Sequence, residues 1–223
     1  MSLFKDIVKL WNSDDLLSQA WDESYEMMVL SNQIFNKAIR YLRENEDLDA
    51  IKALKKRDAE INLFQKDVRR KVVTHYAVSQ NVEDLPNGLV LLNMVVDVER
   101  VGDYTKNILD LALNYPDTML AEEFSSELAE VEIEVISRFE KTITAINSQD
   151  EEVARSLMAT YKDVVSSSDN IVNGCISGEL SQGSESKSVT LALYARYLKR
   201  IAAHLKNIST ILVNPFEAVG YKK

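Results

Sequence analysis

Two acidic side chains, Glu99 and Asp103, stand four residues apart in a stretch whose pattern predicts a helix. Residues at this spacing lie on the same helical face, so the two carboxylates could offer oxygen ligands to a metal cation. Asn107 follows one turn later and could add a carbonyl ligand or orient a bound water. Like charges at this spacing destabilise a helix by roughly 0.2 to 0.5 kcal/mol, a cost that a cation would relieve.

Two carboxylates cannot fill the coordination sphere of such an ion, so further ligands would have to come from a neighbouring helix. Asp58 and Asn62, also four residues apart, are the pair that we expect to supply them. Gly102 supports a close approach at this point, because a glycine inside a helix costs about 0.5 to 1 kcal/mol relative to alanine. Either a neighbouring helix or a ligand would explain it.

The alternative interpretation needs no metal. Glu99 and Asp103 would then be ordinary solvated acids whose charges are relieved by Arg100 and Lys106. Spacing alone favours this interpretation, because acidic side chains on an exposed helical face are common.

Residues suited to catalysis are scarce. A di-iron carboxylate bundle uses a Glu three residues before a His, but Val72 precedes His75 and Ile201 precedes His204 at that distance. We expect both histidines to be surface or packing residues. Cys175 is the only cysteine, which excludes an intramolecular disulfide and a zinc–thiolate cluster within one chain. A non-catalytic protein is therefore favoured over a hydrolase.

The acidic pair belongs to a helix that is repeated 100 residues later. The apolar seam of the first copy comprises Leu91, Met94, Val98, Val101, Thr105, Ile108 and Ala112. The same positions in the second copy are Leu191, Tyr194, Leu198, Ile201, Leu205, Ile208 and Leu212, with Leu205 in place of Thr105. This repeat predicts an internal duplication in which each half buries one long helix edge. The acids are not repeated, because Lys199 and Ala203 stand where the first copy has Glu99 and Asp103.

Six glycines and three prolines in 223 residues predict an all-α chain of two tandem three-helix bundles. We expect domains at 1–12 (an N-terminal amphipathic segment), 13–115 (the first bundle) and 116–223 (the second bundle). The predicted long helices cover approximately 14–45, 48–78, 84–114, a fourth ending near 147, 150–172 and a sixth ending before Pro215. The Gly- and Ser-rich stretch 173–188 is predicted to be a mobile connection.

A net charge of −9 and a pI near 4.9 argue against nucleic acid as a partner. No apolar run approaches the roughly 20 residues that cross a bilayer, and the N-terminus lacks a signal-peptide pattern. The sequence therefore favours a cytoplasmic protein. We expect the segment 1–12 to dock onto the bundle or onto a partner rather than onto a membrane.

The residues 97–104, DVERVGDY, followed by Lys106, Asn107 and Ile108, closely resemble the signature helix of the PhoU family, D-x-E-R-I-G-D ending in N-I. The duplicated three-helix bundle is also that family's architecture. The resemblance implies that Glu99 and Asp103 bind iron or zinc, with Asp97 and Asp58 as further candidate ligands. Because Gln65 replaces a frequent Glu and the second motif has lost both acids, we expect at most one such site, in the first half.

The resemblance further implies a non-enzymatic regulator or adaptor of phosphate transport and phosphate signalling. Its partner would be a phosphate transporter, a sensor histidine kinase or both, so that contact with the membrane would run through the partner. Family members commonly dimerise, which makes a homodimer one expected assembly. The alternative is a metal-free helical scaffold that regulates a different transporter.

Overall fold

The computed structural model describes residues 15–44, 47–79, 83–115, 126–180 and 185–221, and within them it contains helices and no strand. The first half holds α2 (Leu16–Arg43), α3 (Leu48–Lys56), α4 (Asp58–Ser79) and α5 (Leu85–Asn114). The second half holds α6 (Ser126–Ser148), α7 (Glu151–Ala159), α8 (Tyr161–Ser177), α9 (Glu185–Val213) and the short 3-10 helix η2 (Phe216–Ala218). The predicted segment 1–12 lies outside the described residues.

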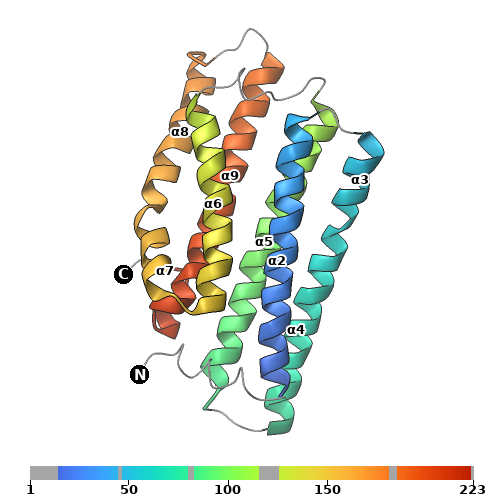
Figure 1. Cartoon of the computed structure of the whole chain (residues 1–223), viewed down its shortest axis with the longest axis vertical. Helices are drawn as coiled ribbons and strands as arrows, with labels where there is room; N and C mark the ends of the chain where they lie inside the picture. Colours follow the sequence, from blue (N-terminus) through green and yellow to red (C-terminus); the bar gives the residue numbers. More distant parts are fainter. Residues whose placement is uncertain (1–14, 45–46, 80–82, 116–125, 181–184, 222–223) are drawn as a thin grey trace.

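The two halves lie side by side along their long axes (Figure 1), and each is a three-helix unit whose middle helix is broken in two. In the first half α2 packs against α4 and α5, and in the second α9 packs against α6, α7 and α8. The halves meet where α5 packs along α9 and α2 along α6. The predicted all-α fold with an internal duplication is confirmed. No helix in the described ranges is both long enough and apolar enough to cross a membrane.

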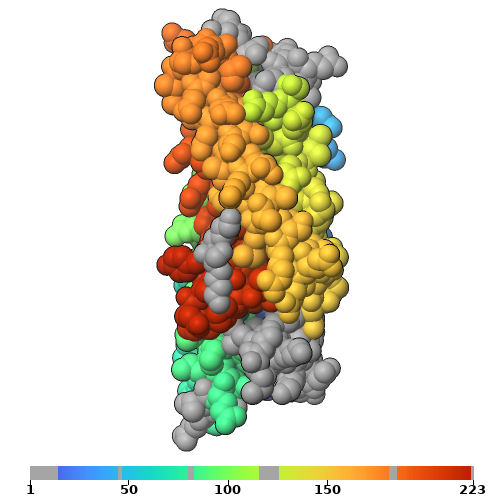
Figure 2. Space-filling view, turned by 90° about the vertical axis from the view of Figure 1, so that its left-hand side faces the viewer, coloured from blue at the N-terminus to red at the C-terminus, as the bar shows by residue number. Residues whose placement is uncertain are grey.

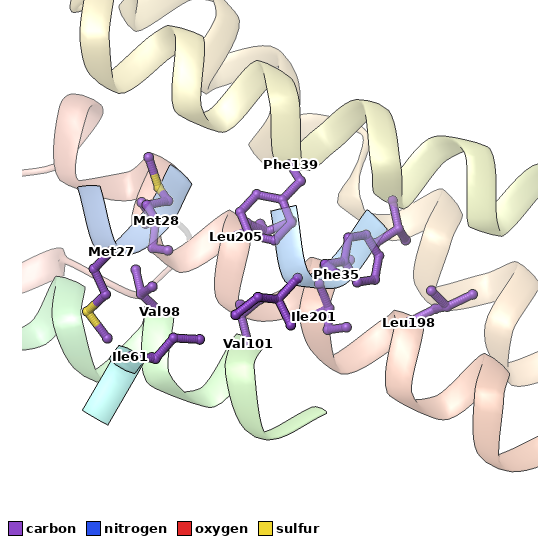
Figure 3. Close-up of a cluster of buried hydrophobic side chains, with 14 of the residues drawn as sticks. Met27, Met28, Phe35, Ile61, Val98, Val101, Phe139, Leu198, Ile201 and Leu205 are labelled. Carbon is purple, nitrogen blue, oxygen red and sulfur yellow. The ribbon is translucent and has the colours of Figure 1, made fainter. Parts of the chain in front are cut away.

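One hydrophobic core runs through both halves. Figure 3 shows Met28 and Phe35 of α2 beside Val101 of α5, Phe139 of α6 and Ile201 of α9. The predicted seam of α9 is buried along its whole length, and that of α5 is buried except at its last position. Arg43 of α2 and Glu132 of α6 add an ion pair of 2.7 Å between the halves.

The prediction of one continuous helix over 48–78 was wrong, because the helix is interrupted at Arg57, between α3 and α4. The Arg57 backbone N–H donates to the carbonyl of Leu54, three residues earlier, which tightens the turn. The Arg57 guanidinium then pairs with Glu60 in the first turn of α4, at 2.8 and 3.0 Å.

The predicted helix 150–172 is likewise divided, at Thr160, and the break is held by a buried arginine. Arg138 of α6 donates to the carbonyl of Leu157 (2.7 Å) and to the hydroxyl of Thr160 (2.6 Å). Its side chain is only 2 % exposed. The first bond gives a partner to one of the carbonyls that the end of α7 leaves without an intrahelical donor, and the second anchors Thr160, whose hydroxyl itself donates to the carbonyl of Ser156 at 2.9 Å.

Of the stretch 173–188 that was predicted to be a mobile connection, residues 173–177 belong to α8 and 185–188 to α9, while 181–184 lie outside the described residues. The helix α8 continues to Ser177 and ends at Gly178 in the left-handed conformation (φ 83°), which a glycine adopts without strain. Leu180 then folds back so that its backbone N–H donates to the carbonyl of Gly174 (3.0 Å). Gly174 and Gly178 therefore take part in the end of α8, which corrects the prediction for the described residues before 181.

Candidate functional site

Gly102 allows α5 to approach α4 closely. A Cβ atom at this position would lie 3.1 Å from Cδ1 of Ile61 and 3.7 Å from Oδ1 of Asp58. Of the two explanations expected for this glycine, the structure supports packing between helices. The close approach brings Asp58 of α4, the acid expected on the neighbouring helix, towards Glu99 and Asp103 of α5.

We call Asp58, Glu99 and Asp103 the acidic cluster. The Nζ atom of Lys106 lies 2.9 Å from Oδ2 of Asp58 and 3.4 Å from Oδ1 of Asp103, so one ammonium bridges α4 and α5. A nitrogen of the Arg100 guanidinium donates to Oδ2 of Asp103 at 3.0 Å, and its Nε lies 3.7 Å from Glu99. The three acids therefore form ion pairs with two basic side chains, Arg100 and Lys106.

Burial and crowding of charge raise the pKa of Glu99. Desolvation is the largest cause, followed by the charge of Asp103 and, more weakly, that of Asp58, while Arg100 and Lys106 oppose the shift. For Lys106, desolvation lowers the pKa, but the hydrogen bond and charge of Asp58 together with Asp103 outweigh it and raise the pKa overall. The Lys106 ammonium therefore stays charged at neutral pH.

The side chains as folded do not fit a metal centre unless Lys106 is displaced. Its ammonium stands where a cation would bridge Asp58 and Asp103. In the part of the chain that the structure describes, no three His, Cys, Asp or Glu side chains are arranged to hold a metal ion. The expected iron or zinc site at the acidic cluster stays a prediction.

The two amides expected to assist the metal differ in position. The Asn62 amide donates to Oδ2 of Asp58 at 3.1 Å, so Asn62 lies beside the acidic cluster. Asn107 is half-buried on α5, and no hydrogen bond joins its side chain to the cluster among the described residues. The structure therefore brings together four of the six predicted site residues.

The sixth residue, Asp97, lies on another face of α5, where α5 packs against α9. Its Oδ1 is 2.7 Å from Nδ1 of His204 and accepts a hydrogen bond from the Asn207 amide at 3.2 Å. The ring of Tyr104 stacks on that of His204, with centroids 5.8 Å apart. His204 and His75 are 9 % and 7 % exposed, so of the two expected positions, surface or packing, both take the buried one.

The second half replaces the acidic pair by a lysine bridge. Lys199, which occupies the position of Glu99, places its Nζ 2.6 and 2.7 Å from the two carboxylate oxygens of Asp169 on α8. This bridge joins α8 to α9 as Lys106 joins α4 to α5. A lysine therefore connects the corresponding pair of helices in each half.

A shallow groove on α6 and α8 is a second candidate site. Figure 2 views the molecule from the side on which α7 and α8 lie, with α6 beside them. We call this depression the acidic groove; it is lined by Glu130, Val131, Glu134, Thr160, Asp163, Val164 and Ser167. Arg138 pairs with Glu134 at 2.9 Å and leaves Glu130 and Asp163 to set the charge of the groove.

Comparison with known proteins agrees with the duplicated fold. The model of the PhoU domain family matches the chain twice, over residues 25–112 and 128–212. None of the curated protein sequences compared with the chain matches it significantly.

Two solved structures share the fold. The crystal structure of PhoU from Pseudomonas aeruginosa superposes with a TM-score of 0.75 at 20 % sequence identity, covering 89 % of this chain and 95 % of that one. The phosphate transport system regulatory protein PhoU from Streptococcus pneumoniae gives a TM-score of 0.76 at 19 % identity, covering 88 % and 93 %. At this identity the likeness shows the fold alone, whereas the two family matches together span most of the sequence. The chain therefore belongs to the PhoU family.

Proposed function

We propose that this protein is a non-enzymatic regulator of phosphate transport that acts in the cytoplasm by binding a membrane partner. The observation that carries the proposal is the PhoU domain match in both halves. The similar fold of a phosphate transport system regulatory protein from Streptococcus pneumoniae supports it. The partner would be a phosphate transporter, a sensor histidine kinase that responds to phosphate, or both.

Binding rather than catalysis is the role that the polar residues support. The two histidines are engaged in packing: His204 contacts Asp97 at 2.7 Å, and the ring of His75 meets that of Tyr76 edge-on at 5.0 Å. Burial raises the pKa of the Cys175 thiol, which makes it a poor nucleophile at neutral pH. The groups that usually perform acid–base or nucleophilic chemistry therefore have other roles here.

The acidic groove is the surface that we propose for the partner. Its carboxylates at Glu130 and Asp163 belong to a chain of net charge −9, so the complementary surface is basic. Such a surface would be supplied by a cytoplasmic loop or domain of the transporter or kinase. Contact with anionic lipid is disfavoured, because the groove and the lipid headgroups carry charge of the same sign.

The test is direct binding to the phosphate transporter of the same organism, purified and held in lipid nanodiscs. The double variant Glu130→Lys/Asp163→Lys should bind at least about tenfold more weakly, because it reverses two charges in the acidic groove. Glu140→Lys is the matched control, since Glu140 is an exposed acid of the same helix outside the groove.

Each result has a distinct meaning. Binding that weakens in the groove variant but not in the control supports both the function and the surface. Equal binding by all three proteins would refute the groove as the docking surface. If wild-type protein binds neither the transporter nor the corresponding sensor kinase, the proposed function is wrong.

A further inference from the structure

We infer that Lys106 is the built-in cation of the acidic cluster and takes the position that a bound metal would otherwise occupy. The contact between α4 and α5 would then be closed by the protein's own ammonium, and the folded protein would not need a metal. This inference concerns the acidic cluster alone and does not depend on the proposed function.

The geometry at Lys106 carries the inference. Its Nζ lies 2.9 Å from a carboxylate of α4 and 3.4 Å from one of α5, so it performs the bridging that a divalent ion performs between carboxylates on two helices. Gly102 removes the side chain that would keep α4 and α5 further apart, as its contacts with Ile61 and Asp58 show. The close approach of the helices is therefore complete with lysine as the bridge.

The carboxylate oxygens nearest to this bridge already have donors. Oδ1 of Asp103 pairs with the Lys106 ammonium, and Oδ2 accepts a hydrogen bond from the Arg100 guanidinium. Oδ2 of Asp58 receives both Lys106 and the Asn62 amide. A metal that used these oxygens would have to displace a charged ammonium and a charged guanidinium, and both ion pairs would be lost.

The second half supports the same interpretation independently. Lys199 stands at the position of Glu99, and its Nζ donates to both carboxylate oxygens of Asp169 on α8, at 2.6 and 2.7 Å. Each half therefore joins its last long helix to the preceding one through a lysine. In the second half no acid remains at either motif position, since Ala203 corresponds to Asp103.

The experiment compares metal binding by full-length wild type, Lys106→Met and Lys199→Met, using isothermal titration with manganese chloride and with zinc chloride. Methionine keeps an unbranched side chain, one atom shorter than that of lysine, and removes the charge. Lys199→Met is the matched control, because it also removes a lysine bridge between two helices but leaves a single carboxylate behind. Thermal melting with and without each metal gives a second readout that does not rely on heat of binding.

We expect Lys106→Met to bind metal at least about a hundredfold more tightly than wild type and to melt at a higher temperature in its presence. Wild type and Lys199→Met should show neither effect. Tight binding by wild type, lost in Glu99→Gln/Asp103→Asn, would overturn the inference, and so would a folded Lys106→Met that binds no metal. If Lys106→Met does not fold even with metal, Lys106→Gln is used in its place. Tight metal binding by the wild type would refute the inference in either case.

Discussion

The contact between Asp97 and His204 offers a quantitative test of how the two halves are held together. It lies between α5 and α9, and the Asp97 and His204 side chains are only 18 % and 11 % exposed. Asp97 accepts hydrogen bonds from two residues of α9, His204 at 2.7 Å and Asn207 at 3.2 Å. The substitution Asp97→Ala removes both bonds and leaves the buried His204 ring and the half-buried Asn207 amide without their acceptor.

A hydrogen bond to a charged group contributes about 1.5 to 3 kcal/mol, and partial access to water reduces this, so we expect Asp97→Ala to lower the free energy of unfolding by about 2 to 3 kcal/mol. In a double-mutant cycle with His204→Ala, the coupling between the two sites should be about 1 to 2 kcal/mol. Urea denaturation followed by circular dichroism measures both quantities.

The control is Asp67→Ala, which breaks an exposed ion pair with Arg70 inside α4. Such pairs contribute about 0.2 to 1 kcal/mol at most, so this variant should be almost as stable as wild type. If Asp97→Ala and Asp67→Ala destabilise the protein equally, or if the cycle shows no coupling, the contact with α9 does not hold the halves together.

Three further substitutions test other contacts. Glu99→Gln should raise the free energy of unfolding at pH 7 by roughly 0.2 to 0.5 kcal/mol. The pKa of Glu99 is raised in the folded protein, so ionisation of Glu99 lowers the stability of wild type as the pH rises. The difference between variant and wild type should therefore disappear well below pH 4, where Glu99 is protonated, when both are unfolded in urea. Arg138→Met should destabilise by about 2 to 4 kcal/mol, because a buried guanidinium with two hydrogen bonds is lost. In the same assay Arg155→Met, which breaks an exposed pair, should change stability by less than about 0.5 kcal/mol, and equal losses would contradict this account. Gly88→Ala should cost about 1 to 3 kcal/mol in melting experiments, since its Cβ would lie 2.5 Å from the ring of Tyr76; an unchanged melting temperature would show that the ring moves freely.

Periodicity and repetition predicted the fold well. The 3,4 spacing of apolar residues placed Met94, Val98 and Val101 on a buried edge, and the same edge 100 residues later predicted the duplication. Such patterns are properties of single helices, which is why they can be recognised before the helices are assembled.

Features that depend on contacts between helices were missed. The break at Thr160 contains no glycine or proline, and it forms because Arg138 reaches it from α6. Arg138 shares a helical face with Val131 and Val135, a spacing that indicates burial, but its charge argued against it. The acidic groove and the pairing of Asp97 with α9 required the relative rotation of neighbouring helices, which one sequence does not specify.

The proposed role of this protein, regulation of phosphate transport, can be tested in cells. The most direct measurement is uptake of radiolabelled phosphate, in phosphate-rich medium, by cells with and without the gene and by cells complemented with wild type or Glu130→Lys/Asp163→Lys. Loss of the gene should raise uptake, wild type should restore it, and the groove variant should not. Uptake that is the same with and without the gene would contradict a role of this protein in phosphate transport.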